Sequence, residues 1–395
     1  MFSIYKNSYL QTSYPEINPR VLNRCVQKAR EFNYADVHDL EPPFQRLVSE
    51  QPTIPVQNVD VTRRPLAFGR RAMPKLKREL LDKDDSVVIA ALQSICDLCH
   101  DPEKGYEAVN LKIIDKMVGL ALHDNPAIRE RTANALQILA RLADGKEAIV
   151  SNQNLLDNLQ ICVEDVVSQV RIQIAALLEM IARFWKTADV LVDYGFIPIL
   201  LVNLINEHSD IAKIHLETLK SLMYSVGKCI ALENDGFNIF LKLLSLKDVE
   251  IVTRACDCLT LLTTSRLGEK MTQEAKLLEA LNTLLYDERI EVHTSAASTI
   301  MFCTIKTRSR IAASKIKGLA KRLIEIAKNR HNPNTQIFAL KALLNICEHP
   351  AIRKEVKNKY LQDITDIQIN SDDPYLKHYK DILLLIINWC AVTVF

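Results

Sequence analysis

The chain has 395 residues, of which 48% are hydrophobic, 25% charged and only 6% aromatic, and its formal net charge is +2. Nine glycines are few for a sheet protein with tight turns, whereas this aliphatic composition suits helices, so an all-α fold is favoured. The nearly balanced charge excludes a global basic field, and we expect neither nucleic acid nor a membrane as a partner.

Residues 1–65 form the first segment and differ in composition from the rest of the chain. They are rich in Tyr, Asn, Gln and Pro and contain one predicted helical stretch, residues 19–32. We interpret this segment as an extended arm that is partly disordered in isolation. Its first ten residues lack the apolar run of a secretory signal, so we expect a cytosolic protein whose cysteines stay reduced.

Residues 66–395 repeat a short helical pattern, a polar break and a longer helical pattern. The spacing of successive breaks is 39 to 44 residues, at Asp84, Asp124, Asp165, Ser209, Asp248, Asp287, His331 and Ser371. This period is typical of armadillo and HEAT repeats and is longer than that of ankyrin or tetratricopeptide repeats. We therefore predict a right-handed helical solenoid of about eight repeats with atypical terminal repeats.

Several breaks carry the residues that begin helices. Asn125-Pro126, Asn332-Pro333 and Asp373-Pro374 each place a capping side chain before a proline, and Asp84 precedes a further helix. Apolar residues at spacings of three and four then predict the buried face of each long helix. The predicted stripes are Ala135, Leu136, Leu139 and Leu142; Ile174, Leu177, Ile181 and Phe184; Ala255, Leu259 and Leu262; and Leu340, Leu343 and Ile346. Shorter partner helices are predicted at 113–122, 196–205, 237–244 and 277–285.

One motif has a chemical meaning, because Cys96-Asp-Leu-Cys99-His100 spells the attachment sequence of haem c. Both cysteines share an apolar stripe with Leu92 and Ile95, and no second Cys or His pair lies nearby at zinc-ligand spacing. We interpret them as core residues and expect no cofactor or metal. The sequence has no phosphate-binding loop and no nucleophile motif, so we expect no enzymatic activity and no small-molecule substrate.

Two basic clusters are candidate partner-binding sites that could meet an acidic protein surface such as a tubulin tail. One lies at the start of the solenoid and the other between residues 306 and 330. The candidate binding residues are Arg63, Arg64, Arg70, Arg71, Lys75, Lys315, Lys317, Lys321 and Arg322. For the first cluster, a solvated helix and a nuclear localisation signal remain open alternatives.

Armadillo proteins that hold extended peptides tend to present an Asn on each long helix. Here only Asn134 and Asn345 are placed in this way, and Trp185 is predicted to close its helix. The missing ladder argues against a nuclear transport receptor.

Two stretches, 66–76 and 91–110, resemble the first repeat of the radial spoke head 14 homolog family. Matches at 300–305, 339–345 and 386–389 follow in order, whereas residues 1–60 have no counterpart and repeats 3 to 5 match only by pattern. The resemblance implies a non-enzymatic scaffold of the radial spoke in the axoneme of motile cilia or flagella. Its partners would be other radial spoke or axonemal proteins. A cytosolic armadillo adaptor that binds peptides or cargo is the alternative.

Overall fold

The computed structural model describes residues 24–26, 28, 71–224, 226–330, 332–369 and 373–389. The chain divides into two compact units, Met1–Arg63 and Arg64–Phe395. In the first unit, residues 24–26 and 28 are helical and exposed, and they fall within the predicted stretch 19–32. The rest of the predicted arm lies outside the described residues.

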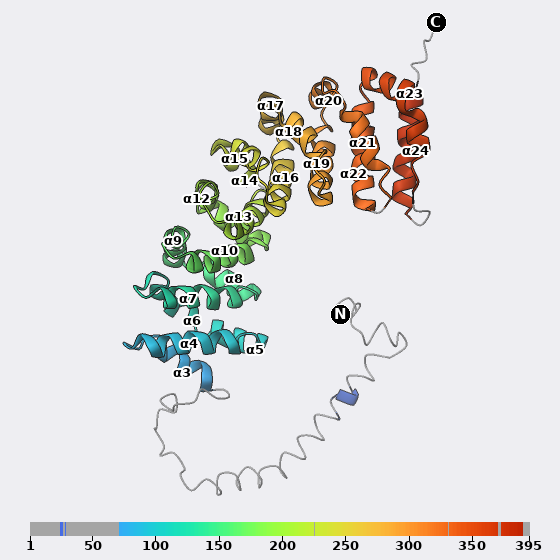
Figure 1. Cartoon of the computed structure of the whole chain (residues 1–395). Helices are drawn as coiled ribbons and strands as arrows, with labels where there is room; N and C mark the ends of the chain where they lie inside the picture. The colour runs from blue at the N-terminus through green and yellow to red at the C-terminus, as the bar shows by residue number, and fades with distance from the viewer. Residues whose placement is uncertain are drawn as a thin grey trace, which may run out of the picture. The chain divides into compact units, whose positions relative to one another are not determined.

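The second unit is built from successive groups of helices, and none of its described residues lies in a strand (Figure 1). Repeat 1 contains α3 (Ala72–Glu79) and α4 (Asp85–Leu98). Repeat 2 contains α5 (Pro102–Asn110), α6 (Ile113–Met117), the 3-10 helix η3 (Gly119–Leu122) and α7 (Pro126–Leu139). Repeat 3 contains α8 (Ala143–Val150), α9 (Gln153–Cys162) and α10 (Ser168–Ala182). Repeat 4 contains α11 (Trp185–Asp193), α12 (Phe196–Asn203) and α13 (Ser209–Leu222).

The later repeats follow the same plan. Repeat 5 contains α14 (Gly227–Glu233), α15 (Gly236–Leu243) and α16 (Val249–Thr263). Repeat 6 contains α17 (Arg266–Glu274), α18 (Leu277–Leu284) and α19 (Ile290–Cys303). Repeat 7 contains α20 (Thr307–Ala313), α21 (Leu319–Ala327) and α22 (Pro333–Cys347). The last repeat has two helices, α23 (Pro350–Thr365) and α24 (Pro374–Asn388). The all-α solenoid predicted from the periodicity is therefore confirmed, and its complete units have the three helices of an armadillo repeat.

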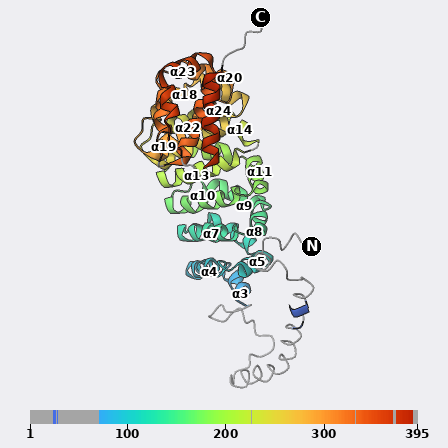
Figure 2. The same ribbon diagram turned by 90° about the vertical axis from the view of Figure 1, so that its right-hand side faces the viewer.

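The long helices form one continuous layer. Each of α4, α7, α10, α13, α16, α19, α22 and α24 packs against the next, and the shorter helices lie along one side of them (Figure 2). One repeat leaves its apolar face uncovered, so the neighbouring repeats complete its core. Among the described helices, none is long and apolar enough to cross a membrane.

The predicted helix starts and core stripes agree closely with the structure. Asp84, Asn125, Asp248, Asn332 and Asp373 each accept a backbone N–H at the start of a long helix. Leu136 and Leu259 are fully buried. Two stripes were predicted one residue too long, because Leu142 and Phe184 lie past the long helices and precede α8 and α11. Trp185 does not close its helix; it begins α11.

Half-buried arginines join neighbouring repeats at the start of two long helices. Arg129 donates through Nε and Nη2 to the Asp165 carboxylate of the next repeat, at 2.6 and 2.9 Å. Arg171 binds Glu207 in the same two-pronged way, at 2.8 and 2.9 Å. The third nitrogen of each arginine donates to a backbone carbonyl six residues earlier, that of His123 or Asp165. Each arginine thus fixes its own loop and the following repeat together.

A small residue also recurs where the first helix of a repeat crosses the end of the preceding long helix. A Cβ atom added at Gly145, Gly227 or Gly268 would lie only 2.0 to 2.2 Å from a carbonyl oxygen of that long helix. In repeat 4 the position is Thr187, whose hydroxyl instead donates to the Ile181 carbonyl at 2.6 Å. The close crossing sets how each repeat turns into the next.

Candidate protein-binding surface

Of the candidate residues in the first basic cluster, two are described by the structure, Arg71 and Lys75. Arg63, Arg64 and Arg70 lie outside the described residues, and Arg71 is exposed. Lys75 corrects the expectation, because only 5% of it is exposed and its Nζ lies 2.9 Å from the Glu79 carboxylate. Its alkyl stem packs into the first repeat, and its charge is compensated there.

The second basic cluster divides into residues that hold the fold and residues that face solvent. Arg322 is half-buried and engaged in the fold: its Nε donates to the Leu285 carbonyl at 2.8 Å and its guanidinium lies over the Tyr286 ring. Lys321 is exposed, with Glu325 at 3.8 Å one helical turn away. Lys315 and Lys317 are exposed and form no ion pair in the structure. These two lysines keep their charge available to a partner.

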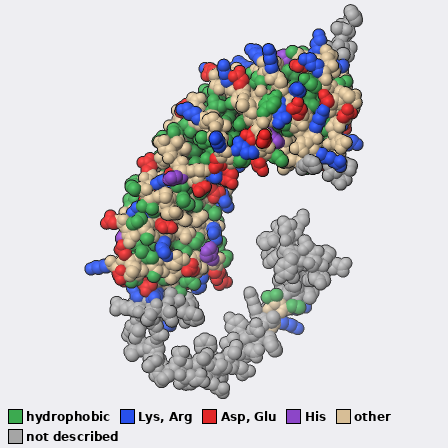
Figure 3. Space-filling view, viewed as in Figure 1, with side chains coloured by type: hydrophobic (Ala, Val, Ile, Leu, Met, Phe, Trp, Pro, Cys, Tyr) green, Lys and Arg blue, Asp and Glu red, His purple; other side chains and the backbone are tan. Residues whose placement is uncertain are grey.

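The basic residues of repeats 7 and 8 belong to a wider separation of charge along the chain. Residues 306–360 hold 14 Lys and Arg against 3 Glu, a net charge of +11. Residues 84–305 hold 20 Lys and Arg against 31 Asp and Glu, a net charge of −11. Figure 3 shows several Lys and Arg side chains over the repeats nearest the C-terminal end. Repeat 7 and most of α23 therefore form a positive region that follows the mainly acidic repeats 2 to 6.

The cysteine motif lies in the core of the first repeats. Cys96 and Cys99 are buried on the face of α4 and its C-cap, whereas His100 is exposed beside the Arg141 guanidinium at 3.2 Å. Burial raises the pKa of the Cys96 thiol to about 11 and that of Cys99 to about 12. Both thiols are thus protonated and serve as packing groups. No group of three or more potential metal ligands occurs among the residues that the structure describes.

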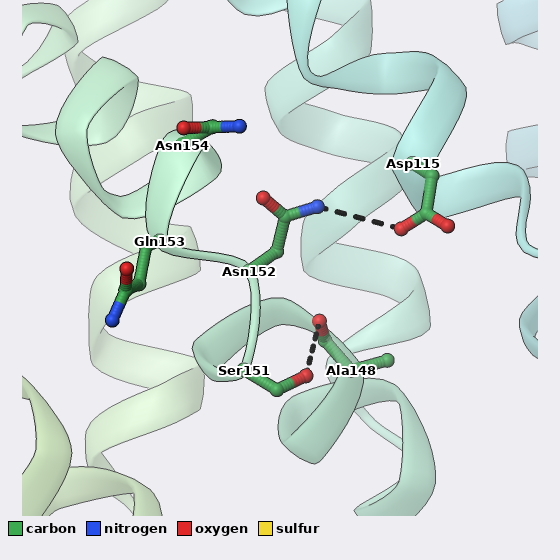
Figure 4. A pocket seen from close by; sticks show the side chains of 6 residues that line it. All are labelled: Asp115, Ala148, Ser151, Asn152, Gln153 and Asn154. Carbon is green, nitrogen blue, oxygen red and sulfur yellow. Dashed lines mark hydrogen bonds between the residues drawn. The ribbon is translucent and has the colours of Figure 1, made fainter.

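A shallow polar hollow opens where α8 turns into α9 (Figure 4). Asn152 donates to the Asp115 carboxylate at 3.4 Å and accepts the Leu155 N–H at 3.1 Å, which caps α9. Ser151 donates to the Ala148 carbonyl at 3.1 Å. Because these polar groups are engaged in ending one helix and starting the next, their arrangement is explained by the fold.

The two candidate ladder asparagines differ in their surroundings. Asn345 donates to the Met301 carbonyl at 2.8 Å, so its amide ties α22 to α19. Asn134 is half-buried on α7, and its side chain forms no hydrogen bond with another described residue. A repeated set of free amides on the long helices is therefore missing from the described repeats.

Comparison with known proteins agrees with this geometry. An engineered protein of known crystal structure matches the chain with a TM-score of 0.71 at 20% sequence identity, over 80% of this chain and 78% of its own. A designed armadillo repeat protein matches with a TM-score of 0.53 at 15% identity, over 58% of this chain and 99% of its own. This chain has the armadillo-repeat fold. Computationally designed armadillo repeat proteins for modular peptide recognition match this armadillo chain with a TM-score of 0.55 at 16% identity, over 58% of it and 99% of their own length. No family model matches the armadillo chain.

One surface of the armadillo solenoid escaped the sequence reasoning. Large apolar side chains are exposed where long helices turn into the first helix of the next repeat: Trp185, Tyr224, Val226, Leu267 and Ile305. The signal was present in the sequence, since each lies between the last buried residues of a long helix and the small residue at the helix crossing. Recognising it required the repeats to be aligned at that crossing instead of at the polar breaks.

Proposed function

We propose that this protein is a non-enzymatic scaffold that binds other proteins, and that it serves in the radial spoke of motile cilia or flagella. The armadillo fold supports the first part, because a stack of repeats offers long, rigid surfaces to several partners at once. The separation of charge adds support, since the C-terminal repeats suit acidic protein surfaces.

The resemblance of the stretches 66–76 and 91–110 to the radial spoke head 14 homolog family carries the second part. These residues correspond to the first repeat and the start of the second, from before α3 to the end of α5. The other matches, at 300–305, 339–345 and 386–389, fall at the C-terminal ends of α19, α22 and α24 or within them. The order of the matches along the solenoid favours a relation over the whole array.

The test is the location of the tagged full-length protein in a ciliated cell. We expect it along the axoneme, and we expect it to disappear from axonemes whose radial spokes are genetically absent. A diffuse cytosolic signal with no axonemal fraction would contradict the radial spoke assignment. It would favour the cytosolic adaptor and leave protein binding itself to be tested in vitro.

A further inference from the structure

The junctions between long helices and the following first helices form a distinct edge in repeats 4 to 7. The four junctions are residues 183–187, 224–228, 264–268 and 305–310. Each begins just past the end of a long helix and includes the small or buried residue at the helix crossing, Thr187, Gly227, Gly268 or Ser309. Because the junctions occupy the same place in successive repeats, their exposed side chains form a row along one edge of the solenoid.

Apolar side chains in this row are unusually open to solvent. The exposed fractions are 66% for Trp185, 65% for Tyr224, 64% for Val226, 49% for Leu267 and 52% for Ile305. A single exposed apolar residue needs no explanation, but one or two in the same junction of four successive repeats make an extended patch.

The charge of the row differs from that of the surrounding repeats. The four junctions contain seven basic residues and no acidic one, although residues 84–305 as a whole have a net charge of −11. Three of the seven already have partners in the fold: Arg183 pairs with Glu179, Arg310 with Glu348, and Lys228 donates to Thr264. The other four, Lys186, Arg266, Lys306 and Arg308, are exposed and form no ion pair with another described residue.

Contacts between neighbouring junctions make the edge continuous. Lys228 Nζ lies 3.2 Å from the Thr264 hydroxyl, which joins the second junction to the third. Helices α17 and α20, which begin at the third and fourth junctions, pack against each other. Helix α11, which begins at the first junction, packs against α13, which ends just before the second. Within the first junction, the Lys186 Nζ lies over the Trp185 ring, 5.7 Å from its centre. A polypeptide lying along this edge would thus meet both apolar side chains and cations.

We infer that this junction edge is a docking surface for an acidic polypeptide segment that carries apolar side chains. This inference rests on the protein-binding role proposed above, but it does not depend on the location in the radial spoke. Apolar side chains of the segment would cover Trp185, Val226, Leu267 and Ile305. Its carboxylates would contact the exposed cations of the same junctions. A nucleic acid fits less well, because its charged backbone brings no aliphatic side chains to cover Val226, Leu267 and Ile305.

The test uses the full-length protein and a fluorescent synthetic peptide with the repeating sequence Glu-Glu-Leu-Phe, measured by fluorescence anisotropy. We expect the double variant Lys306→Glu/Arg308→Glu to bind this peptide about tenfold more weakly than the wild type. The double variant Trp185→Ser/Leu267→Ser should lose peptide affinity by a similar factor. Added salt should weaken binding to the wild type. A peptide of repeating Glu-Glu-Ser-Gly should bind more weakly because it has no anchors.

The matched control is Lys242→Glu/Lys247→Glu, which reverses two exposed lysines at the end of the second helix of repeat 5, away from the junctions. It should leave peptide affinity unchanged. Four results would each overturn the inference: no binding of the Glu-Glu-Leu-Phe peptide, an equal loss in the control, equal binding of both peptides, or tighter binding of a polyuridine oligonucleotide. Peptide binding along the edge in a protein that is absent from axonemes would leave this inference standing and contradict only the radial spoke assignment.

Discussion

His215 lies inside the long helix α13, with both ring nitrogens buried and without a hydrogen-bond partner among the described residues. Burial lowers its pKa to about 4, while the charge of Glu207 opposes this shift and that of Arg171 adds to it. The folded protein therefore holds this imidazole neutral at a pH where the unfolded chain, with a histidine pKa of about 6.5, already binds a proton. The histidine makes the centre of the array sensitive to mild acid.

We predict that the free energy of unfolding falls by about 1 kcal/mol between pH 7.5 and 5.5 because of His215. The sign follows from proton binding: below pH 6.5 the unfolded chain takes up a proton that the folded chain excludes until about pH 4. Urea unfolding of wild type and His215→Leu across this range is the measurement. The wild-type curve should be steeper, and parallel curves for the two proteins would contradict the prediction.

The arginine joints give a second prediction for single residues. Burial tends to raise the pKa of Glu207, but the hydrogen bonds from Arg171 and from a backbone N–H outweigh it and hold this pKa below its usual range. Arg171→Met would leave a carboxylate that is only 6% exposed without its cation, so we expect a loss of about 3 kcal/mol. Adding Glu207→Gln should recover part of that loss.

Chemical denaturation of the single and double variants measures this coupling. Lys359→Met is the matched control, because Lys359 pairs with Glu355 at 3.2 Å on the exposed side of α23. It should change stability by less than about 0.5 kcal/mol. If Lys359→Met lost as much stability as Arg171→Met, burial would not be what makes the Arg171–Glu207 pair strong.

At the scale of helices, the crossing of α8 over the end of α7 depends on the absence of a side chain at Gly145. An added Cβ would lie 2.1 Å from the Leu139 carbonyl oxygen and 2.8 Å from its carbon, and backbone atoms can yield only by moving the helices apart. We expect Gly145→Ala to lower the free energy of unfolding by more than about 2 kcal/mol. Gly119→Ala is the matched control, since nothing lies within 4 Å of its added Cβ. Its effect should stay within about 1 kcal/mol in thermal or urea unfolding. Similar losses in both variants would contradict the crossing as the cause.

At the scale of the whole armadillo array, each repeat is stabilised by its neighbours, so damage should spread locally. Leu259→Ala in α16 should lower the free energy of unfolding by about 2 to 5 kcal/mol. Hydrogen exchange should then speed up in α13, α16 and α19 and remain slow in α4 and α7. Leu136→Ala in α7 should reverse this pattern, with fast exchange in α4, α7 and α10. Mass spectrometry measures the exchange in each helix. Equal loss of protection in all helices of either variant would contradict nearest-neighbour stabilisation.

The sequence by itself determined the helices, their order and the core. Caps such as Asn125 and Asn332 act on N–H groups two or three residues away, and apolar stripes repeat every three or four residues, so both depend on short spacings in the chain. The period of the breaks then determined the solenoid, because a repeat packs only on the next one. The same logic correctly placed Cys96 and Cys99 in the core.

Only the tertiary structure decided which charged residues are available. Arg129 pairs with a residue 36 positions away and Arg322 with a carbonyl 37 positions away, and no local pattern reveals such partners. Lys75 and Lys317 look alike in the sequence, yet one is buried beside Glu79 and the other is exposed. The junction edge likewise appears only when successive repeats stack, because stacking brings side chains about forty residues apart into one row.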